Sequence, residues 1–283
     1  MTLTNPVGDE TVTRTVAVAR ARSRRKRFRP RRAILGTAGI VILLLIWQIA
    51  AMIGIVDPRF LPPPSVVIPK LFEIFLVGEF WVAVWDTIVS WGLGLLIALV
   101  LGCVLGVIIG LSPFLRRATN STIEFLRPVP SVALIPLATL LFGARIESAL
   151  LLIVYAAFWQ ILIQVLYGVA DVDNIAMSTG RSYGFSKWQR VRDIVLPTML
   201  PYLMTGVRLA AAVALILAVT AQLIIGTPGL GKEIALAQNA GLYSTMYALI
   251  LATGLLGVVI NFGVRGVERW LLSWHQSVRE DVV

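Results

Sequence analysis

The chain contains several long blocks of apolar residues with almost no charges, and these blocks limit its possible folds more than any other feature. A helix needs about 20 such residues to cross the roughly 30 Å hydrocarbon core of a bilayer. Hydrophobic residues make up 58% of the sequence and charged residues 14%, whereas about a quarter of the residues of a soluble domain are charged. The sequence therefore predicts an all-α membrane protein, a polytopic bundle of six transmembrane helices.

The first predicted span, residues 33–56, is longer than the roughly 7–15 residue apolar region of a cleaved signal peptide, so we expect it to be retained. Residues 57–81 follow as an external segment that is rich in proline and then amphipathic. A membrane core is expected over 82–270, and a cytoplasmic tail over 271–283. The five spans of this core are expected at about 82–111, 119–142, 147–169, 199–225 and 246–267.

Positive charge is concentrated at the N-terminus, where residues 1–32 hold ten of the 25 Lys and Arg residues. Cytoplasmic segments of membrane proteins are enriched in these residues, so both termini are predicted to be cytoplasmic. The N-terminal segment is expected to be disordered and to contact the anionic lipid bilayer. No nucleic-acid-binding motif accompanies the charge, and a nucleic-acid partner is not expected.

The sequence has no pattern typical of a catalytic or metal site. Cys103 is the single cysteine and lies in an apolar block, and His275 is the single histidine. Residues 226–232 match the phosphate-binding loop Gly-x4-Gly-Lys, but Glu233 follows where a Ser or Thr would hold Mg²⁺. This segment is instead interpreted as the external turn after the fifth span. No catalytic residue, metal ligand or bound cofactor is expected on this chain.

The polar break at 170–197 has the pattern of a folded element and not of a passive linker. Asp173 is predicted to cap a first short helix, and Gly184 suits a positive φ after it. Ser186–Gln189 reads as a capping box at the start of a second helix, which Pro197 is expected to end. Two short helices around a glycine would form a projection that can dock on another protein.

This break resembles the cytoplasmic coupling loop of binding-protein-dependent ABC importer permeases of type I. The family pattern is Glu-Ala-Ala, three residues, Gly, nine residues, Ile, two residues and Pro, and its last three positions match here. The segment 178–180 replaces Glu-Ala-Ala, so the resemblance does not carry over an ion pair from that Glu to the ATPase. The expected coupling-loop residues are Ser178, Thr179, Gly180, Gly184, Trp188, Ile194 and Pro197.

Further segments resemble the branch of this family that imports sulfonates, taurine, nitrate and related compounds: 61–65, 127–130 with Pro136, 206–208 and 229–231. The resemblance implies a permease in the bacterial cytoplasmic (inner) membrane, which carries a small solute such as a sulfonate-like anion. Two copies of this chain would form the pore, two ATPase subunits would bind ATP and Mg²⁺, and an external binding protein would deliver the solute. The chain itself is then a transport subunit and not an enzyme.

The charged residues furthest from the ends of the predicted spans are Glu124, Arg127 and Arg208, and an unpaired charge within the bilayer costs at least about 3 kcal/mol. Under one interpretation, Arg127 and Arg208 attract an anionic solute while Glu124 holds one of them in place. Under the other, Glu124 forms a structural ion pair with an arginine, or the arginines extend toward the interface. The candidate residues for the translocation path are Arg127, Arg208, Glu124, Trp159, Gln160, Gln164 and Gln222.

Small residues recur at every fourth position in two spans, which lets helix backbones approach closely. This spacing fits packing within one chain as well as a subunit interface. The residues are Gly94, Ala98, Gly102, Gly106 and Gly110 in the second span, and Gly206, Ala210, Ala214 and Ala218 in the fifth.

An ion-coupled secondary carrier is the main alternative function. Such carriers have inverted repeats, broken helices and buried carboxylates, whereas this sequence has no clear repeat and only Glu124 at depth. A membrane enzyme is disfavoured because neither metal-ligand spacing nor a Gly-x-Ser-x-Gly motif is present. The dependence of uptake on ATP separates the importer from the carrier.

Overall fold

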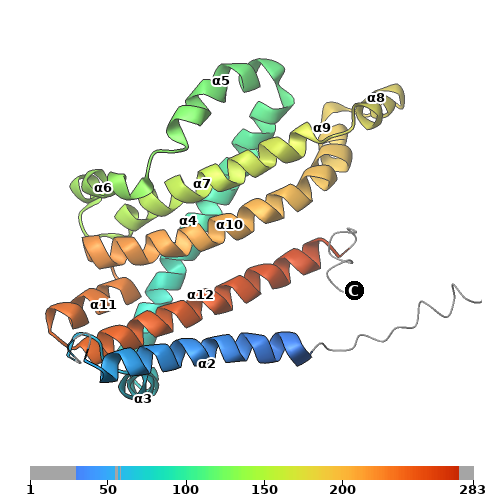
Figure 1. The fold of residues 1–283 in the computed structure, drawn as a ribbon. Coiled ribbons are helices and arrows are strands. Elements are labelled where there is room, and N and C mark those ends of the chain that lie inside the picture. Colours follow the sequence, from blue (N-terminus) through green and yellow to red (C-terminus); the bar gives the residue numbers. More distant parts are fainter. Residues whose placement is uncertain (1–29, 55–56, 58, 274–283) are drawn as a thin grey trace, which may run out of the picture.

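The structure is a computed structural model and describes residues 30–54, 57 and 59–273. All regular elements in this part of the chain are helices, as expected (Figure 1). Most of the predicted N-terminal segment 1–32, most of the tail 271–283 and His275 lie outside the described residues. The confirmed fold class is therefore that of an all-helical membrane protein.

The helices follow one another through short connections, and α9, a π-helical turn and α10 are continuous along the chain. In chain order the elements are α2 (Pro30–Met52), α3 (Pro64–Phe75), α4 (Gly78–Leu111), α5 (Pro113–Leu126), a 3₁₀ turn (Ser131–Leu134), α6 (Ile135–Phe142), α7 (Ile146–Ala170), α8 (Asn174–Ser182), α9 (Lys187–Arg190), the π-helical turn (Val191–Val195), α10 (Leu196–Ile225), α11 (Leu230–Asn239) and α12 (Tyr243–Leu271).

Five helical segments of the described part are long and apolar enough to cross a membrane, and they contain α2, α4, α7, α10 and α12. The single third span expected at 119–142 is instead a pair of helical segments, 113–126 and 131–142, bent by 82°. Pro128 and Pro130 lie between them. Proline interrupts backbone hydrogen bonding and disfavours the helical conformation of the residue before it, which accounts for the break. The pair completes a sixth span if its two parts count as one.

Helix α7 lies at the centre of the bundle and packs against both α4 and α10. The small residues of α4 face it: a methyl group added at Gly102 would lie 2.7 Å from Ile161 Cγ2, and one at Gly106 would lie 2.6 Å from Val165 Cγ1. On α10, Ala210, Ala214 and Ala218 are fully buried in the same core. Both stripes of small residues therefore serve helix packing within one chain.

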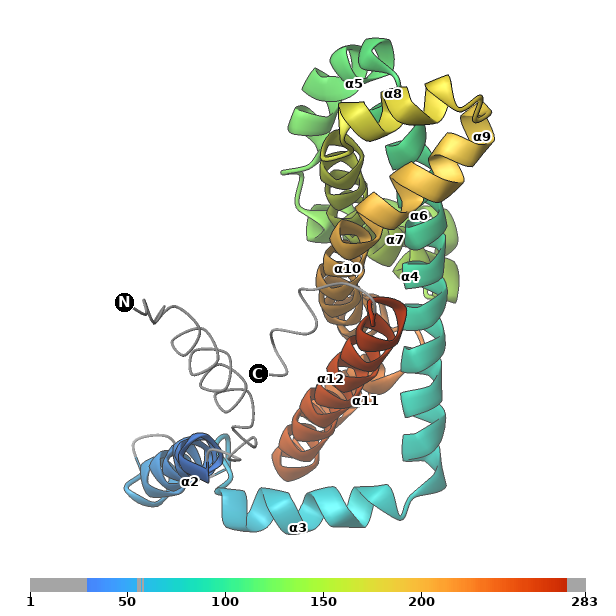
Figure 2. The same ribbon diagram turned by 90° about the vertical axis from the view of Figure 1, so that its right-hand side faces the viewer.

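The two ends of the bundle are distinct (Figure 1). One end carries the α8–α9 loop together with the start of α2 and the end of α12, and the other end carries α3, α6 and α11. Figure 2 looks at the first end and shows α3 running sideways from α2 to the start of α4. A second apolar core joins α3 and α11 to α12 and to the first turns of α4. We call these the loop end and the α11 end.

Candidate functional site

The first half of the α8–α9 loop is held by local hydrogen bonds, as predicted. Asp173 Oδ1 accepts a hydrogen bond of 2.7 Å from the backbone N–H of Ile175 and caps α8. Gly184 has φ +77°, its N–H donates to the Arg181 carbonyl at 3.0 Å, and the next N–H, of Phe185, donates to Gly180. Glycine is favoured here because other residues adopt this conformation at a cost of about 1 kcal/mol or more.

The second half of the loop begins with the predicted capping box. The Gln189 N–H donates to Ser186 Oγ at 3.2 Å, and the Ser186 N–H donates to Gln189 Oε1 at 2.7 Å. The expectation that Pro197 ends this helix is wrong, because the chain continues through the π-helical turn into α10. A π-helical turn widens the backbone, and a proline in the first turn of the following helix is tolerated there.

Two of the predicted coupling residues pack against each other. A methyl group added at Gly180 would lie 3.1 Å from Ile194 Cδ1, so the absence of a side chain lets α8 approach the π-helical turn. Gly180 is buried, and so is the neighbouring Val195. The two arms of the loop thus form one packed unit, and this unit is continuous with the membrane helix α10.

The outer surface of the loop exposes large apolar side chains outside the predicted spans. Trp188 is 69% exposed, Tyr183 is 80% exposed and Ile175 is 74% exposed. Ser178 and Thr179 line a shallow hollow of about 410 Å³ on α8. Exposed apolar groups gathered on one surface are typical of a protein-binding site, and buried aromatic anchors contribute much of the energy at such sites.

The charges on this loop are mainly basic. Arg181, Lys187, Arg190 and Arg192 lie on it, and Arg192 Nε is 3.8 Å from the carboxylate of Asp193. Arg190 Nε is buried and has no hydrogen-bond partner in the part of the chain that the structure describes. The loop therefore offers hydrogen-bond donors and positive charge to whatever binds it.

The structure corrects the expected partners of the membrane charges. Arg208 Nη1 lies 3.6 Å from Glu268 Oε2 and links α10 to α12, so an ion pair forms but not with Glu124. Glu124 instead accepts a hydrogen bond of 2.8 Å from Asn120 Nδ2, one turn earlier on α5. Glu124 lies on α5, just before the 82° bend, and is exposed.

Arg127 is exposed at the end of α5, where its backbone N–H caps the helix. Its guanidinium has no hydrogen bond or ion pair with the described residues. It lines a pocket of about 480 Å³ together with Glu124, Arg116 and Tyr167. This open pocket brings together two of the seven predicted path residues.

The other predicted path residues lie further inside the bundle. Trp159 is buried, whereas Gln160 and Gln164 are half-buried on the face of α7 that meets Gly206. Gln222 is completely buried, and this position does not fit a role in lining a path.

Gln222 instead stabilises the α10–α11 turn from within. Its Oε1 accepts hydrogen bonds of 3.1 Å from Thr87 Oγ1 and from the Gly231 N–H, and its Nε2 donates to Ser90 Oγ at 3.3 Å. The sequence reasoning missed Thr87 and Ser90, although two hydroxyls three residues apart in an apolar block are a detectable signal. The glycines of this turn are needed here because a side chain at Gly229 would overlap this amide, and one at Gly231 would overlap the Val219 carbonyl oxygen.

Comparison with known proteins agrees with the helical architecture. Residues 98–273 match the model of the family described as binding-protein-dependent transport system inner membrane component. The taurine transport system permease protein TauC of Escherichia coli is 32% identical, over 91% of this chain and 96% of its own length. The nitrate import permease protein NrtB of Synechocystis sp. is 26% identical, over 84% of this chain and 89% of its own.

A solved structure shares the fold at lower identity. A chain of the MetNI methionine ABC transporter, in an inward-facing conformation, superposes with a TM-score of 0.59 at 19% identity, over 67% of this chain and 95% of that chain. The chain therefore belongs to the binding-protein-dependent transport system inner membrane components, and is a multi-pass permease subunit of an ABC transporter that is not itself an ATPase.

Proposed function

We propose that this chain forms the translocation path of an importer for a small organic anion, delivered by an external binding protein and driven by two copies of a separate ATPase. The observation that carries the proposal is the α8–α9 loop, which exposes aromatic side chains and continues without interruption into α10. The names of the relatives support an oxyanion cargo, since TauC is a taurine permease and NrtB a nitrate permease.

The loop end is where the energy of ATP hydrolysis enters under this proposal. Closure of two ATPase subunits on ATP would move the docked loop, and its packed arms would transmit that motion to α10 as a lever. The ATP and Mg²⁺ are held by the ATPase and not by this chain. Because the loop must meet a cytoplasmic ATPase, the start of α2 and the end of α12 at the same end are cytoplasmic too (Figure 1).

The ATPase that fits this loop should present an apolar groove with acidic residues at its rim. Ser178 stands where the family has Glu, so the first helix contributes no negative charge at that position. Arg181, Lys187 and Arg190 would meet the acidic rim, while Trp188 and Tyr183 fill the groove. Complementary charge of this kind selects the correct partner among related ATPases.

A second copy of this chain completes the path. Arg127 and Glu124 are exposed on the surface of a single chain within the membrane-embedded core, where an unhydrated charge costs at least about 3 kcal/mol. We place them on a water-filled path enclosed between two identical subunits. In that position Arg127 provides positive charge for an anionic solute.

The test is uptake into sealed vesicles that contain the permease and its ATPase, with the binding protein outside and labelled taurine as the probe. Uptake is expected only with hydrolysable ATP on the ATPase side, and it should persist when ionophores collapse ion gradients. Uptake that follows an ion gradient without ATP would establish a secondary carrier and overturn the proposal.

Replacing Arg127 by glutamine is expected to lower the maximal uptake rate of an anionic solute about fivefold. The reason is the loss of an attraction of about 1 kcal/mol between the guanidinium and the anion in a partly desolvated path. The measurement is initial uptake at saturating binding protein, with Arg127→Lys as the control that keeps the charge. Unchanged kinetics in Arg127→Gln would remove this arginine from the path.

A further inference from the structure

A pocket of about 360 Å³ lies at the α11 end of the bundle, away from the coupling loop. Helix α4, the first turn of α7 and the α10–α11 turn form its walls. Under the proposed orientation this end faces the exterior. The polar residues in the lining are Asp86, Ser90, Arg145, Glu147 and Thr227.

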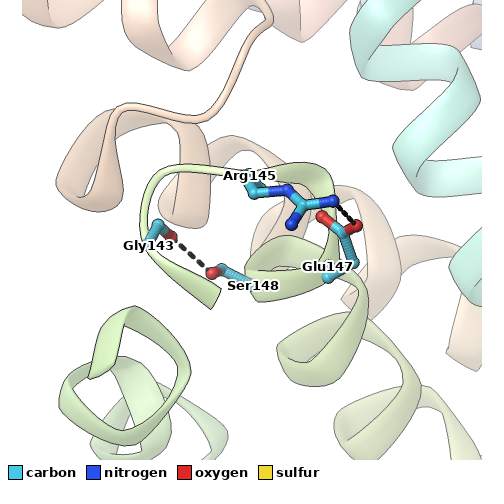
Figure 3. Close-up of polar contacts among 4 residues, drawn as sticks. All are labelled: Gly143, Arg145, Glu147 and Ser148. Atoms are coloured by element: carbon cyan, nitrogen blue, oxygen red, sulfur yellow. Dashed lines mark hydrogen bonds and ion pairs between the residues drawn. The ribbon is translucent and has the colours of Figure 1, made fainter. Parts of the chain in front are cut away.

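The turn before α7 fixes the position of the charged groups. Figure 3 shows the Arg145 guanidinium lying across the Glu147 carboxylate, with Nη2 and Oε1 2.7 Å apart. Beside them, the buried Ser148 Oγ donates to the Gly143 carbonyl at 2.6 Å and thereby closes the turn. The first turn of α7 also favours a negative charge because of the helix dipole.

Several hydrogen-bonding atoms of this pocket are unsatisfied. Thr227 is only 2% exposed, and its Oγ1 has no hydrogen-bond partner among the described residues. Glu147 Oε2 is likewise buried and unpartnered. The half-buried carboxylate of Asp86 makes no hydrogen bond or ion pair with the described part of the chain. A buried unsatisfied group of this kind costs about 1–3 kcal/mol, so a ligand that satisfies it binds favourably.

The chemistry of the lining selects the ligand. Two carboxylates and one guanidinium leave one net negative charge, so the complement is a monovalent cation that donates hydrogen bonds. A primary ammonium group has three N–H donors, which match Asp86, Glu147 Oε2 and Thr227 Oγ1 in number. The described residues contain no group of three or more His, Cys, Asp or Glu side chains suited to a metal ion.

The rim of the pocket carries the opposite charge. Arg145 is 73% exposed, and only one of its nitrogens is engaged with Glu147. Its remaining N–H groups are free to bind the oxygens of a sulfonate or phosphate. A ligand with an ammonium group at one end and an oxyanion at the other therefore fits both parts.

We propose that this pocket binds a small zwitterion, with its ammonium group between Asp86, Glu147 and Thr227 and its oxyanion at Arg145. Two sources share this chemistry: a transported aminoalkanesulfonate such as taurine, and the ethanolamine headgroup of a membrane lipid. The first source rests on the proposed function, whereas the second depends only on the pocket being at the membrane surface.

The direct test is equilibrium binding of labelled taurine to the purified permease–ATPase complex in detergent, without binding protein. The solute source predicts saturable binding that ethanolamine displaces and that ethanesulfonate, which lacks the ammonium group, does not. Asp86→Asn and Glu147→Gln should each weaken binding by about tenfold or more, because each removes a charged hydrogen-bond partner. Thr227→Val should weaken it about fivefold.

The matched control is Glu73→Gln, which neutralises an exposed carboxylate on α3 at the same end and outside the pocket. It should leave binding unchanged, and the thermal unfolding midpoint of each variant shows that the complex is folded. The lipid source is measured by mass spectrometry of complexes purified from membranes that contain phosphatidylethanolamine. If the lipid is the ligand, phosphatidylethanolamine should copurify with the complex. The amount retained should be lower in Asp86→Asn and unchanged in Glu73→Gln.

The proposal is overturned if taurine binding and lipid retention are both absent, or if neither responds to these pocket variants. ATP-driven uptake is measured on the same preparation, which separates the two ideas. Intact ATP-driven uptake with no ligand in the pocket rejects the zwitterion site alone. Binding without ATP-driven uptake rejects the importer function and keeps the site.

Discussion

Replacing Gly184 by arginine is expected to abolish ATP-driven uptake while leaving the permease in the membrane at the wild-type level. Gly184 has φ +77°, and no atom outside its neighbours lies within 4 Å of an added Cβ. The substitution therefore costs about 1–2 kcal/mol of local backbone strain, and the new side chain projects from the loop without disturbing the core. It would obstruct docking between α8 and α9, where the ATPase is proposed to bind.

Gly241→Arg is the matched control for this variant. Gly241 has φ +70°, an equally open surrounding and a backbone N–H bonded to the carbonyl three residues earlier, as Gly184 has. It lies between α11 and α12 at the opposite end, so its arginine adds the same strain and charge away from the loop. Uptake should be retained in Gly241→Arg, and normal ATP-coupled uptake in Gly184→Arg would refute the role of the loop.

Local rules predicted the parts of the loop that depend on neighbouring residues. The cap at Asp173, the positive φ of Gly184 and the Ser186 capping box each involve residues only a few positions apart, and such motifs are visible in a sequence. Pro197 was misjudged because a proline is compatible with either the end of a helix or the first turn of one. Only the π-helical turn before it decides between them.

Contacts between distant segments could not be predicted in the same way. Arg208 pairs with Glu268, 60 positions later, on a helix whose rotation about its own axis no local pattern reveals. Gln222 illustrates a second limit, since an amide in a membrane helix satisfies its hydrogen bonds equally well on a polar path or inside the bundle. Its partners on α4 and α11 are brought together only by the fold.

The bend after α5 shows a third limit of the sequence reasoning. Hydropathy averaged over a window of residues finds apolar stretches but not their direction, and the prolines at 128 and 130 indicate a break without its angle. The angle of 82° gives the two halves of the expected third span different directions. The predicted list of path residues therefore mixed exposed positions such as Arg127 with buried ones such as Trp159.

Replacing Gly102 by leucine is expected to destabilise the permease by about 3 kcal/mol or more, near the upper end of overpacking effects. Its backbone lies against α7, where an added Cβ would come within 2.7 Å of Ile161 and 3.3 Å of the Leu162 backbone nitrogen. A backbone atom cannot move aside as a flexible side chain can. Leucine would therefore separate α4 from α7, the helix that organises the whole bundle.

The contrast with Gly92 isolates this packing from helix propensity. Gly92 lies on the same helix, ten residues earlier, and an added Cβ there has no atom within 4 Å. Gly92→Leu should therefore leave the thermal unfolding midpoint in detergent unchanged or slightly raised, while Gly102→Leu lowers it and reduces the amount of permease in the membrane. Adding Ile161→Ala to Gly102→Leu should restore part of the loss, since it vacates the volume that the leucine needs. Equal behaviour of the two glycine variants would contradict close α4–α7 packing within one chain, and would favour the subunit interface as the reason for the small residues.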